Sequence, residues 1–254
     1  MNDHGSQPAM NTITYPKTLV IIPALNEEDS IAYVIDLIHQ HAPWADIAVI
    51  NDGSSDRTGA IAEACGAIAL HMPYNVGIGA AVQTGFLYAS ERDYDVTVQT
   101  DGDGQHPPSE IPGLVETLMR SDADIIIGSR FLEDRGYRAP TPRRIGIIIL
   151  ARIISWVTGQ RCTDPTSGFR ASNRRTIRLC SRLYPHDYPE PEAIVMLHRA
   201  GLRVREVPVA MSARYGGRSS ITPLRSGVYM VKVILAILIG LLRRAPTLED
   251  HATT

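Results

Sequence analysis

Cysteine is scarce in this sequence, and the few cysteines are not spaced as a structural site. The 254 residues include only Cys65, Cys162 and Cys180. Their number is odd and no two have C-x-x-C spacing, so neither a disulfide framework nor a zinc site is indicated. We expect buried thiols in a reducing compartment, and hence a cytoplasmic protein.

Long hydrophobic runs are also missing. A transmembrane helix takes about twenty apolar residues, whereas the run Val233–Leu242 has ten and is bounded by Lys232, Arg243 and Arg244. The helix expected over 224–244 could be a core helix, a partner-binding helix or one that lies in the membrane interface. We favour the interface or a partner, because the run is apolar nearly all round and lies near the chain end.

The start of the chain lacks the basic and apolar segments of a signal peptide. Residues 1–16 are therefore expected to form a disordered tail. A chain of this length can bury one sizeable core. We expect one catalytic domain over 17–223, followed by the apolar helix 224–244 and a second tail over 245–254.

Basic residues are scarce in one half of the chain and concentrated in the other. Residues 1–129 contain 4 Lys and Arg against 18 Asp and Glu, a net charge of −14, and residues 130–254 contain 21 against 9, a net charge of +12. A basic half is typical of binding to nucleic acid or to an anionic membrane surface, and it can also be a solvated face. No aromatic stacking platform accompanies the arginines, so nucleic acid is not an expected partner.

The most informative segment is 96–106, V-T-V-Q-T-D-G-D-G-Q-H, in which a strand-like run stops at two carboxylates. The β-branched residues before Asp101 predict a buried strand, and the two glycines allow the backbone to turn sharply. Asp101 and Asp103 can then direct hard oxygen ligands to one point. This arrangement suits Mg²⁺ or Mn²⁺ bound together with substrate phosphates. Gln105 and His106 lie within reach of the same point.

The same segment could also be a calcium loop or an ordinary turn. A calcium loop of the EF-hand type that starts at Asp101 would need Gly at its sixth position and Glu at its twelfth, where His106 and Pro112 stand. That interpretation is excluded. An ordinary Asp-Gly turn stays open from this segment alone.

Other segments repeat an order of apolar strand and helix. Short apolar runs at 19–22, 47–50 and 67–70 each precede a helical pattern, and 125–127 adds a further strand. This alternation predicts an α/β fold with an open, mostly parallel sheet flanked by helices. In such sheets, ligands bind outside the carboxyl ends of the strands.

Polar residues stand at those carboxyl ends. Asn26 and Glu27 follow the first strand, Asp52 follows the second, and Asp101 and Asp103 follow the fourth. Three acidic strand ends favour a nucleotide pocket over three unrelated turns. The G-x-G formed by Gly77 and Gly79 is by itself a weak indication of a nucleotide site, because it lacks a third glycine and does not open the first helix of the chain.

The motifs of the chain, taken in order and spacing, resemble those of family 2 glycosyltransferases of the GT-A fold. They are V-I-I-P-A-L-N-E-E, V-I-N-D-G-S-S-D-R-T, N-V-G-I-G-A-A, Q-T-D-G-D-G-Q-H, I-G-S-R-F and S-G-F-R. The resemblance extends from Leu19 to about Arg244. Within the family, the chain is most similar to bacterial enzymes that resemble dolichyl- and polyprenyl-phosphate sugar transferases. It implies a GT-A type sheet with C-terminal helical additions, a nucleotide-sugar donor, Mg²⁺ or Mn²⁺, and transfer of a hexose in a single displacement with inversion.

The resemblance also assigns roles to individual residues. The nucleotide-binding residues would be Pro23, Ala24, Asn26, Glu27, Asp52, Gly77, Asp101 and Gly102. The metal would be held by Asp101, Asp103 and Gln105. The catalytic residues would be Asp101, Asp103, Arg130 and Asp164. The acceptor or its phosphate would meet Arg143, Arg144, Arg214, Arg218 and Ser219.

Two departures from that family branch leave the acceptor open. The late basic loop of the branch usually ends in Ser-Lys, where Ser219 and Ser220 stand, and a transmembrane segment is missing. What the resemblance implies is a polyprenyl phosphate or a related cell-envelope glycan as the acceptor, and a UDP- or GDP-sugar as the donor. A lipid phosphate is already an anion, whereas a sugar hydroxyl needs a general base, for which Asp164, Glu190 and Glu192 are the candidates.

Other activities are disfavoured by particular residues. A nucleotidyltransferase would share the sheet, but it would carry a glycine-rich phosphate loop after the first strand, where P-A-L-N stands. A sugar-nucleotide-binding module without catalysis is disfavoured because the aspartate pair is intact. We expect a peripheral protein at the inner face of the cell membrane, held by the membrane surface or a small membrane protein. A homo-oligomer stays open.

Overall fold

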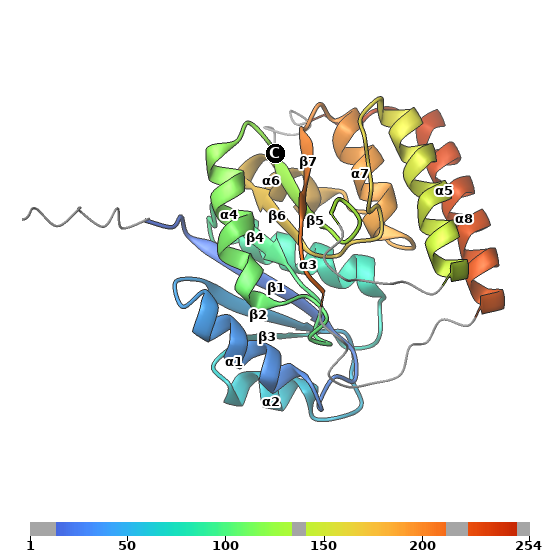
Figure 1. Ribbon diagram of the computed structural model, residues 1–254. Helices are drawn as coiled ribbons and strands as arrows, with labels where there is room; N and C mark the ends of the chain where they lie inside the picture. The colour runs from blue at the N-terminus through green and yellow to red at the C-terminus, as the bar shows by residue number, and fades with distance from the viewer. Residues whose placement is uncertain (1–13, 134–140, 212–222, 248–254) are drawn as a thin grey trace, which may run out of the picture.

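The computed structural model describes residues 14–133, 141–211 and 223–247, without the side chains of 141–143 and 223–229. The described residues form a seven-stranded sheet with the order β3-β2-β1-β4-β6-β5-β7 (Figure 1). Its strands are β1 (Thr18–Ala24), β2 (Asp46–Asn51), β3 (Ile68–His71), β4 (Val96–Gln99), β5 (Ile125–Ser129), β6 (Arg170–Asn173) and β7 (Val204–Pro208). Neighbouring strands are parallel except where β6 pairs with β4 and β5. The predicted α/β fold with a mostly parallel sheet is confirmed.

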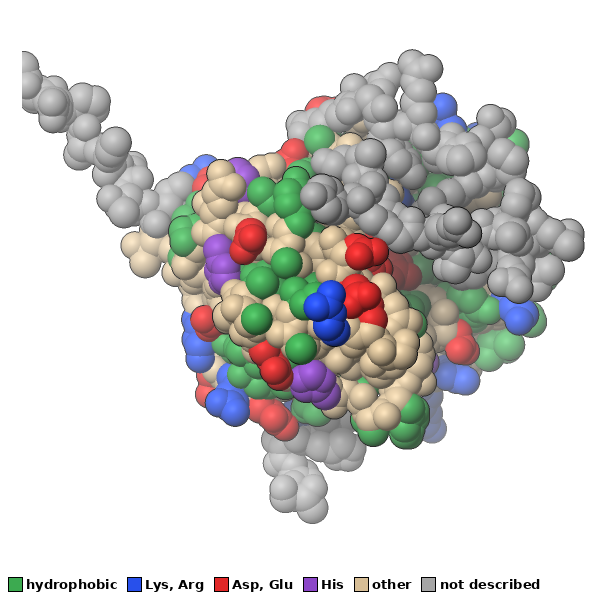
Figure 2. Space-filling view, turned by 90° about the horizontal axis from the view of Figure 1, so that it is seen from below, with side chains coloured by type: hydrophobic (Ala, Val, Ile, Leu, Met, Phe, Trp, Pro, Cys, Tyr) green, Lys and Arg blue, Asp and Glu red, His purple; other side chains and the backbone are tan. Residues whose placement is uncertain are grey.

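Helices cover both faces of the sheet. One face carries α1 (Ile31–His41), α2 (Thr58–Ala64), the short 3₁₀ helix η1 (Pro108–Glu110) and α4 (Ile111–Arg120). The other carries α3 (Ile78–Glu91), α6 (Arg174–Arg182) and α7 (Pro189–Arg199). Beyond α7, α5 (Thr141–Thr158) and α8 (Pro223–Leu242) lie side by side at the outer edge (Figure 1). The space-filling view shows acidic side chains spread over the end covered by α1 and α2, with basic side chains both among them and towards the edges (Figure 2).

The core has two layers because successive residues of a strand point to opposite faces of the sheet. In β1, Leu19 and Ile21 pack towards α3, whereas Val20 and Ile22 pack towards α1. All four side chains are fully buried. A central parallel strand covered on both faces requires such a continuous apolar run, which is why the sequence signals it strongly.

The strand β6 has no counterpart among the predicted strands. It lies between the loop and the helix that the sequence predicts, and its residues are R-A-S-N. Its pairing with β4 and β5 buries Arg170, Ala171 and Ser172 in the centre of the sheet. A run of four residues with polar members carries neither strand nor helix periodicity, so sequence pattern alone does not reveal it.

Helix α8 matches the helix predicted over 224–244, and it is partly a core helix. Val233 and Ile237 are buried in the same apolar core as α5 and α7. Arg199 of α7 donates hydrogen bonds to the carbonyls of Gly240 and Arg243 and so holds the end of α8. No helix in the described part of the chain has both the length and the apolar character needed to cross a bilayer.

Candidate active site

The acidic segment leaves β4 at the carboxyl edge of the sheet, as the sequence predicts. The backbone N–H of Gln105 donates to Asp103 Oδ1 at 2.9 Å. His106 Nε2 lies 3.0 Å from Asp101 Oδ2 and must donate there, because a carboxylate only accepts. Burial lowers the pKa of His106, so the ring is neutral and orients Asp101 without adding charge. The side chain of Asp101 remains 39% exposed.

The residues at this turn fit a divalent ion that is shared with a substrate. The described residues contain no group of three or more His, Cys, Asp or Glu side chains placed to hold a metal. Two carboxylates at one turn are the partial, hard-oxygen donor set that Mg²⁺ or Mn²⁺ completes with substrate phosphates and water. Thr100 Oγ1 and His106 Nδ1 are buried beside it and have no hydrogen-bond partner among the described residues.

A cleft of about 290 Å³ opens beside the aspartate pair. It is lined by Pro23, Ala24, Leu25, Glu27, Asp52, Asn75, Gly77, Ile78, Ala81, Asp101, Gly102 and Asp103. The structure therefore brings together the segments after β1, β2, β3 and β4, and all the predicted nucleotide-binding residues except one line this cleft. The cleft is also lined by Leu25, Asn75, Ile78 and Ala81, which lie within the family motifs but have no individual role assigned from sequence.

The exception is Asn26, which does not line the cleft. Its backbone is left-handed, with φ of 56°, a conformation that Asn tolerates better than most residues. Its Oδ1 accepts hydrogen bonds from the backbone and hydroxyl of Ser55, and its N–H donates to Ser54 Oγ. Asn26 thus joins the loop after β1 to the loop after β2.

Asp52 holds the neighbouring wall of the cleft. Its carboxylate accepts hydrogen bonds from the N–H groups of Val76 at 2.7 Å and Gly77 at 3.0 Å. Gly53 follows with φ of 70°, and a Cβ there would lie 2.5 Å from the backbone of Asn75. The two loops can approach this closely only because the residue is glycine.

Arg130 and Asp164 form a buried ion pair, and neither residue lines the cleft. Arg130 follows β5, and its backbone N–H and its Nε both donate to Asp164 Oδ2, while Nη2 donates to Oδ1 at 2.6 Å. Nη2 also donates to Thr166 Oγ1 at 2.7 Å. The side chain of Asp164 is 0% exposed. An inaccessible carboxylate with both oxygens on a guanidinium favours an orienting role for Asp164 over the role of general base.

The other candidate bases lie on the first turn of α7. Burial raises the pKa of Glu190, which the nearby Arg170 opposes. Burial and the neighbouring carboxylate of Asp187 raise the pKa of Glu192. Arg170 donates to the carbonyls of Ser167 and Glu190, and its Nη1 is buried without a partner in the described part of the chain. The Glu190 carboxylate therefore binds a proton more tightly than an exposed glutamate does.

The predicted acceptor-binding residues are only partly described. Arg144 is exposed on α5 and lines a cavity of about 500 Å³ with Phe131, Arg152, Arg161 and Thr163, next to the Arg130–Asp164 pair. The sequence did not single out Arg152 or Arg161. The Arg143 side chain, and all of Arg214, Arg218 and Ser219, lie outside the described residues.

Two curated proteins are similar to this chain over most of its length. Polyprenol monophosphomannose synthase of Mycolicibacterium smegmatis is 32% identical over 240 residues, covering 90% of this chain and 89% of that protein. Undecaprenyl-phosphate mannosyltransferase of Micrococcus luteus is 31% identical over 222 residues, covering 81% and 88%.

A solved structure shares the fold. Glucosyl-3-phosphoglycerate synthase from Mycobacterium tuberculosis, in complex with Mn²⁺, uridine diphosphate and glucosyl-3-phosphoglycerate, superposes with a TM-score of 0.69 at 24% identity, covering 89% of this chain and 79% of that one. This likeness confirms the GT-A fold. The family described as Glycosyl transferase family 2 matches residues 19–179. The chain is a glycosyltransferase and belongs to glycosyl transferase family 2.

Proposed function

We propose that the enzyme is a metal-dependent, inverting glycosyltransferase that moves a sugar from a UDP- or GDP-sugar to a polyprenyl phosphate. The observation that carries the proposal is that Asp101 and Asp103 line one cleft together with Asp52 and Gly77. The names of the relatives support a polyprenyl-phosphate acceptor. The Mn²⁺ and uridine diphosphate in the solved structure support the metal and the donor class.

Each part of the site has a task in this reaction. Cleavage of the bond between sugar and diphosphate leaves negative charge on the leaving group. Asp101 and Asp103 would hold the Mg²⁺ or Mn²⁺, which supplies positive charge at that diphosphate. His106 orients the Asp101 carboxylate through the hydrogen bond from its Nε2. Asp52 fixes the loop against which the nucleoside lies.

The acceptor would approach from the side of Arg130 and Arg144, and Arg130 would meet a phosphate. A lipid phosphate is an anion near neutral pH and attacks without a general base, which agrees with the burial of Asp164. A sugar hydroxyl in polysaccharide synthesis is the second candidate acceptor, and the raised pKa of Glu190 favours that residue as its base. Gln105 stays a proposed metal ligand.

The activity is tested by incubating the purified enzyme with labelled nucleotide sugars and polyprenyl phosphate. We expect a sugar-lipid product and free nucleoside diphosphate, loss of turnover on chelation with EDTA, and recovery with Mn²⁺ or Mg²⁺. Release of pyrophosphate would instead identify a nucleotidyltransferase. Full turnover in EDTA would contradict the role of the aspartate pair.

We also propose that the enzyme docks on the inner face of the cell membrane through α5 and α8. Nine of the sixteen exposed large hydrophobic residues in the described part of the chain lie on these two helices. They are Ile145, Ile148, Ile149, Trp156, Val231, Leu235, Leu238, Ile239 and Leu242. Exposed Arg144, Arg152, Lys232 and Arg243 flank them. An apolar face with a basic rim suits an anionic bilayer surface.

This docking predicts a defined loss of membrane binding. Removal of the whole of α8 would expose the core, because Val233 and Ile237 are buried. The triple variant Leu235→Gln, Leu238→Gln, Leu242→Gln keeps those contacts and removes exposed apolar area. We expect it to sediment with phosphatidylglycerol vesicles much less than wild type does, because binding scales with buried apolar area.

The matched control is Met119→Gln on α4, which is 48% exposed and lies away from α5 and α8. We expect this variant to bind vesicles as wild type does. Equal sedimentation of the triple variant and wild type would refute the docking face. If the wild-type protein does not bind vesicles but binds one small membrane protein, that protein is the partner and the lipid surface is not.

A further inference from the structure

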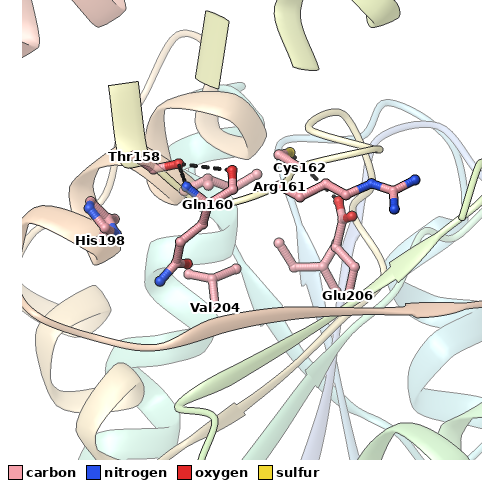
Figure 3. A pocket seen from close by; sticks show the side chains of 9 residues that line it. Thr158, Gln160, Arg161, Cys162, His198, Val204 and Glu206 are labelled. Atoms are coloured by element: carbon pink, nitrogen blue, oxygen red, sulfur yellow. Dashed lines mark hydrogen bonds between the residues drawn. The ribbon is translucent and has the colours of Figure 1, made fainter. Parts of the chain in front are cut away.

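Glu206 of β7 turns its carboxylate towards the segment Cys162–Asp164 (Figure 3). Its oxygens accept hydrogen bonds from the N–H of Thr163 at 2.8 and 2.9 Å, from the Thr163 hydroxyl at 2.7 Å and from the N–H of Asp164 at 2.9 Å. The thiol of Cys162 lies 3.6 Å from the same carboxylate. One side chain therefore binds three consecutive residues of this loop.

The Glu206 carboxylate is stabilised by the N–H and O–H donors of Thr163 and Asp164. Within the described residues, Glu206 forms no ion pair with Lys, Arg or His. A carboxylate that accepts several N–H and O–H groups makes charge-assisted hydrogen bonds, which are stronger and more directional than neutral ones. The segment Cys162–Asp164 lies outside the strands of the sheet, so its N–H groups depend on such a partner.

The segment that Glu206 holds is the one that positions Arg130. Asp164 is fully buried and binds both the backbone and the guanidinium of Arg130. Thr163 Oγ1 also lies 2.6 Å from the hydroxyl of Ser129, the last residue of β5. Strands β5 and β7 are parallel neighbours, with Ile127 opposite Glu206. Contacts therefore run without a gap from Glu206 through Asp164 to Arg130.

We propose that Glu206 is a positioning residue for sugar transfer, which sets Arg130 through Asp164 and touches neither donor nor acceptor. The inference rests on the proposed function, in which Arg130 meets a phosphate. Glu206 does not line the cleft beside Asp101. Its loss should therefore slow the chemical step and leave nucleotide binding in place.

The first test is Glu206→Ala under saturating donor and acceptor. We expect kcat to fall by roughly 10- to 100-fold, by analogy with the loss found when the residue that orients a metal ligand is removed, with the KM for the nucleotide sugar unchanged. Glu206→Gln keeps an acceptor oxygen but places an N–H donor among N–H donors, so we expect an intermediate loss. It also serves as the informative variant if Glu206→Ala does not fold.

The matched control is Arg205→Ala. Arg205 is the adjacent residue of β7, lies on the opposite face of the sheet and pairs with Asp122. This variant breaks an ion pair on the same strand, so a general weakening of β7 would lower its kcat as well. We expect its kcat to stay at the wild-type value.

A coupling experiment separates positioning from mere stabilisation. Arg130→Lys retains a positive charge but loses the fork that Asp164 binds, and Glu206→Ala should have little further effect on kcat in that background. An equal fold-loss in both backgrounds, or wild-type kcat in Glu206→Ala and Glu206→Gln, would overturn the proposal. Failure of the proposed function is distinguishable, because the wild-type enzyme itself would then transfer no sugar.

Discussion

Replacement of Asp103 by Asn is expected to lower the rate of sugar transfer by roughly three orders of magnitude while the protein stays folded. Asp103 is 5% exposed, and its Oδ1 accepts the N–H of Gln105. Asn keeps the shape and one acceptor oxygen, so the turn after β4 survives. It removes the negative charge that a divalent ion needs at this point, and the leaving diphosphate loses its counter-charge.

Two measurements check this expectation. Initial rates with saturating nucleotide sugar and Mn²⁺ give the loss of transfer, and calorimetric titration with nucleoside diphosphate gives binding with and without Mn²⁺. We expect the variant to lose the part of the binding that depends on Mn²⁺. The control is Glu28→Gln, whose carboxylate pairs with exposed Arg57 outside the cleft. A wild-type, metal-dependent rate in the Asp103→Asn variant would rule out the proposed metal site.

The N-terminal part of the fold follows from sequence because its signals are local. Strands β1, β2 and β4 are short apolar or β-branched runs, and all their residues except Asp46 are buried. Parallel strands place their carboxyl ends at one edge. Sequence alone therefore assigns Asp52 and Asp101 to one cleft, although they lie 49 positions apart in the chain.

Other features could not be predicted because they depend on distant contacts. The strand β6 is recognisable only once β4 and β5 are in place on either side of it. The ion pair of Arg130 and Asp164 joins residues 34 positions apart, and neither lies in a periodic segment. From sequence alone, Asp164 is therefore a candidate general base. Its complete burial, which no local pattern encodes, favours an orienting role instead.

The apolar run of the C-terminal helix α8 contributes both to the core and to the exposed surface. A run that is apolar nearly all round is compatible with the core, a partner or the membrane interface. In the structure, Val233 and Ile237 face the core, whereas Leu235 and Leu242 face outwards. Packing against α5 and α7 decides which residues are left exposed, and that packing is not visible in the sequence of α8 itself.

Replacement of Asp164 by Ala is expected to destabilise the protein by about 3–5 kcal/mol, because it leaves the guanidinium of Arg130 buried without its counter-charge. For a chain of this size the melting temperature should fall by roughly 6–20 °C, measured by differential scanning calorimetry. The control is Glu28→Gln, which breaks the exposed pair with Arg57 and should cost no more than about 1 kcal/mol.

A double variant identifies the unpaired charge as the cause of that loss. Asp164→Ala combined with Arg130→Met removes both charges, so part of the lost stability should return, as is found when buried ion pairs are replaced by apolar residues. Transfer activity should not return, because the proposed phosphate contact of Arg130 is gone. If the double variant melts no higher than Asp164→Ala alone, the lost stability comes from the cavity or the loop backbone. The unpaired charge of Arg130 is then not the cause.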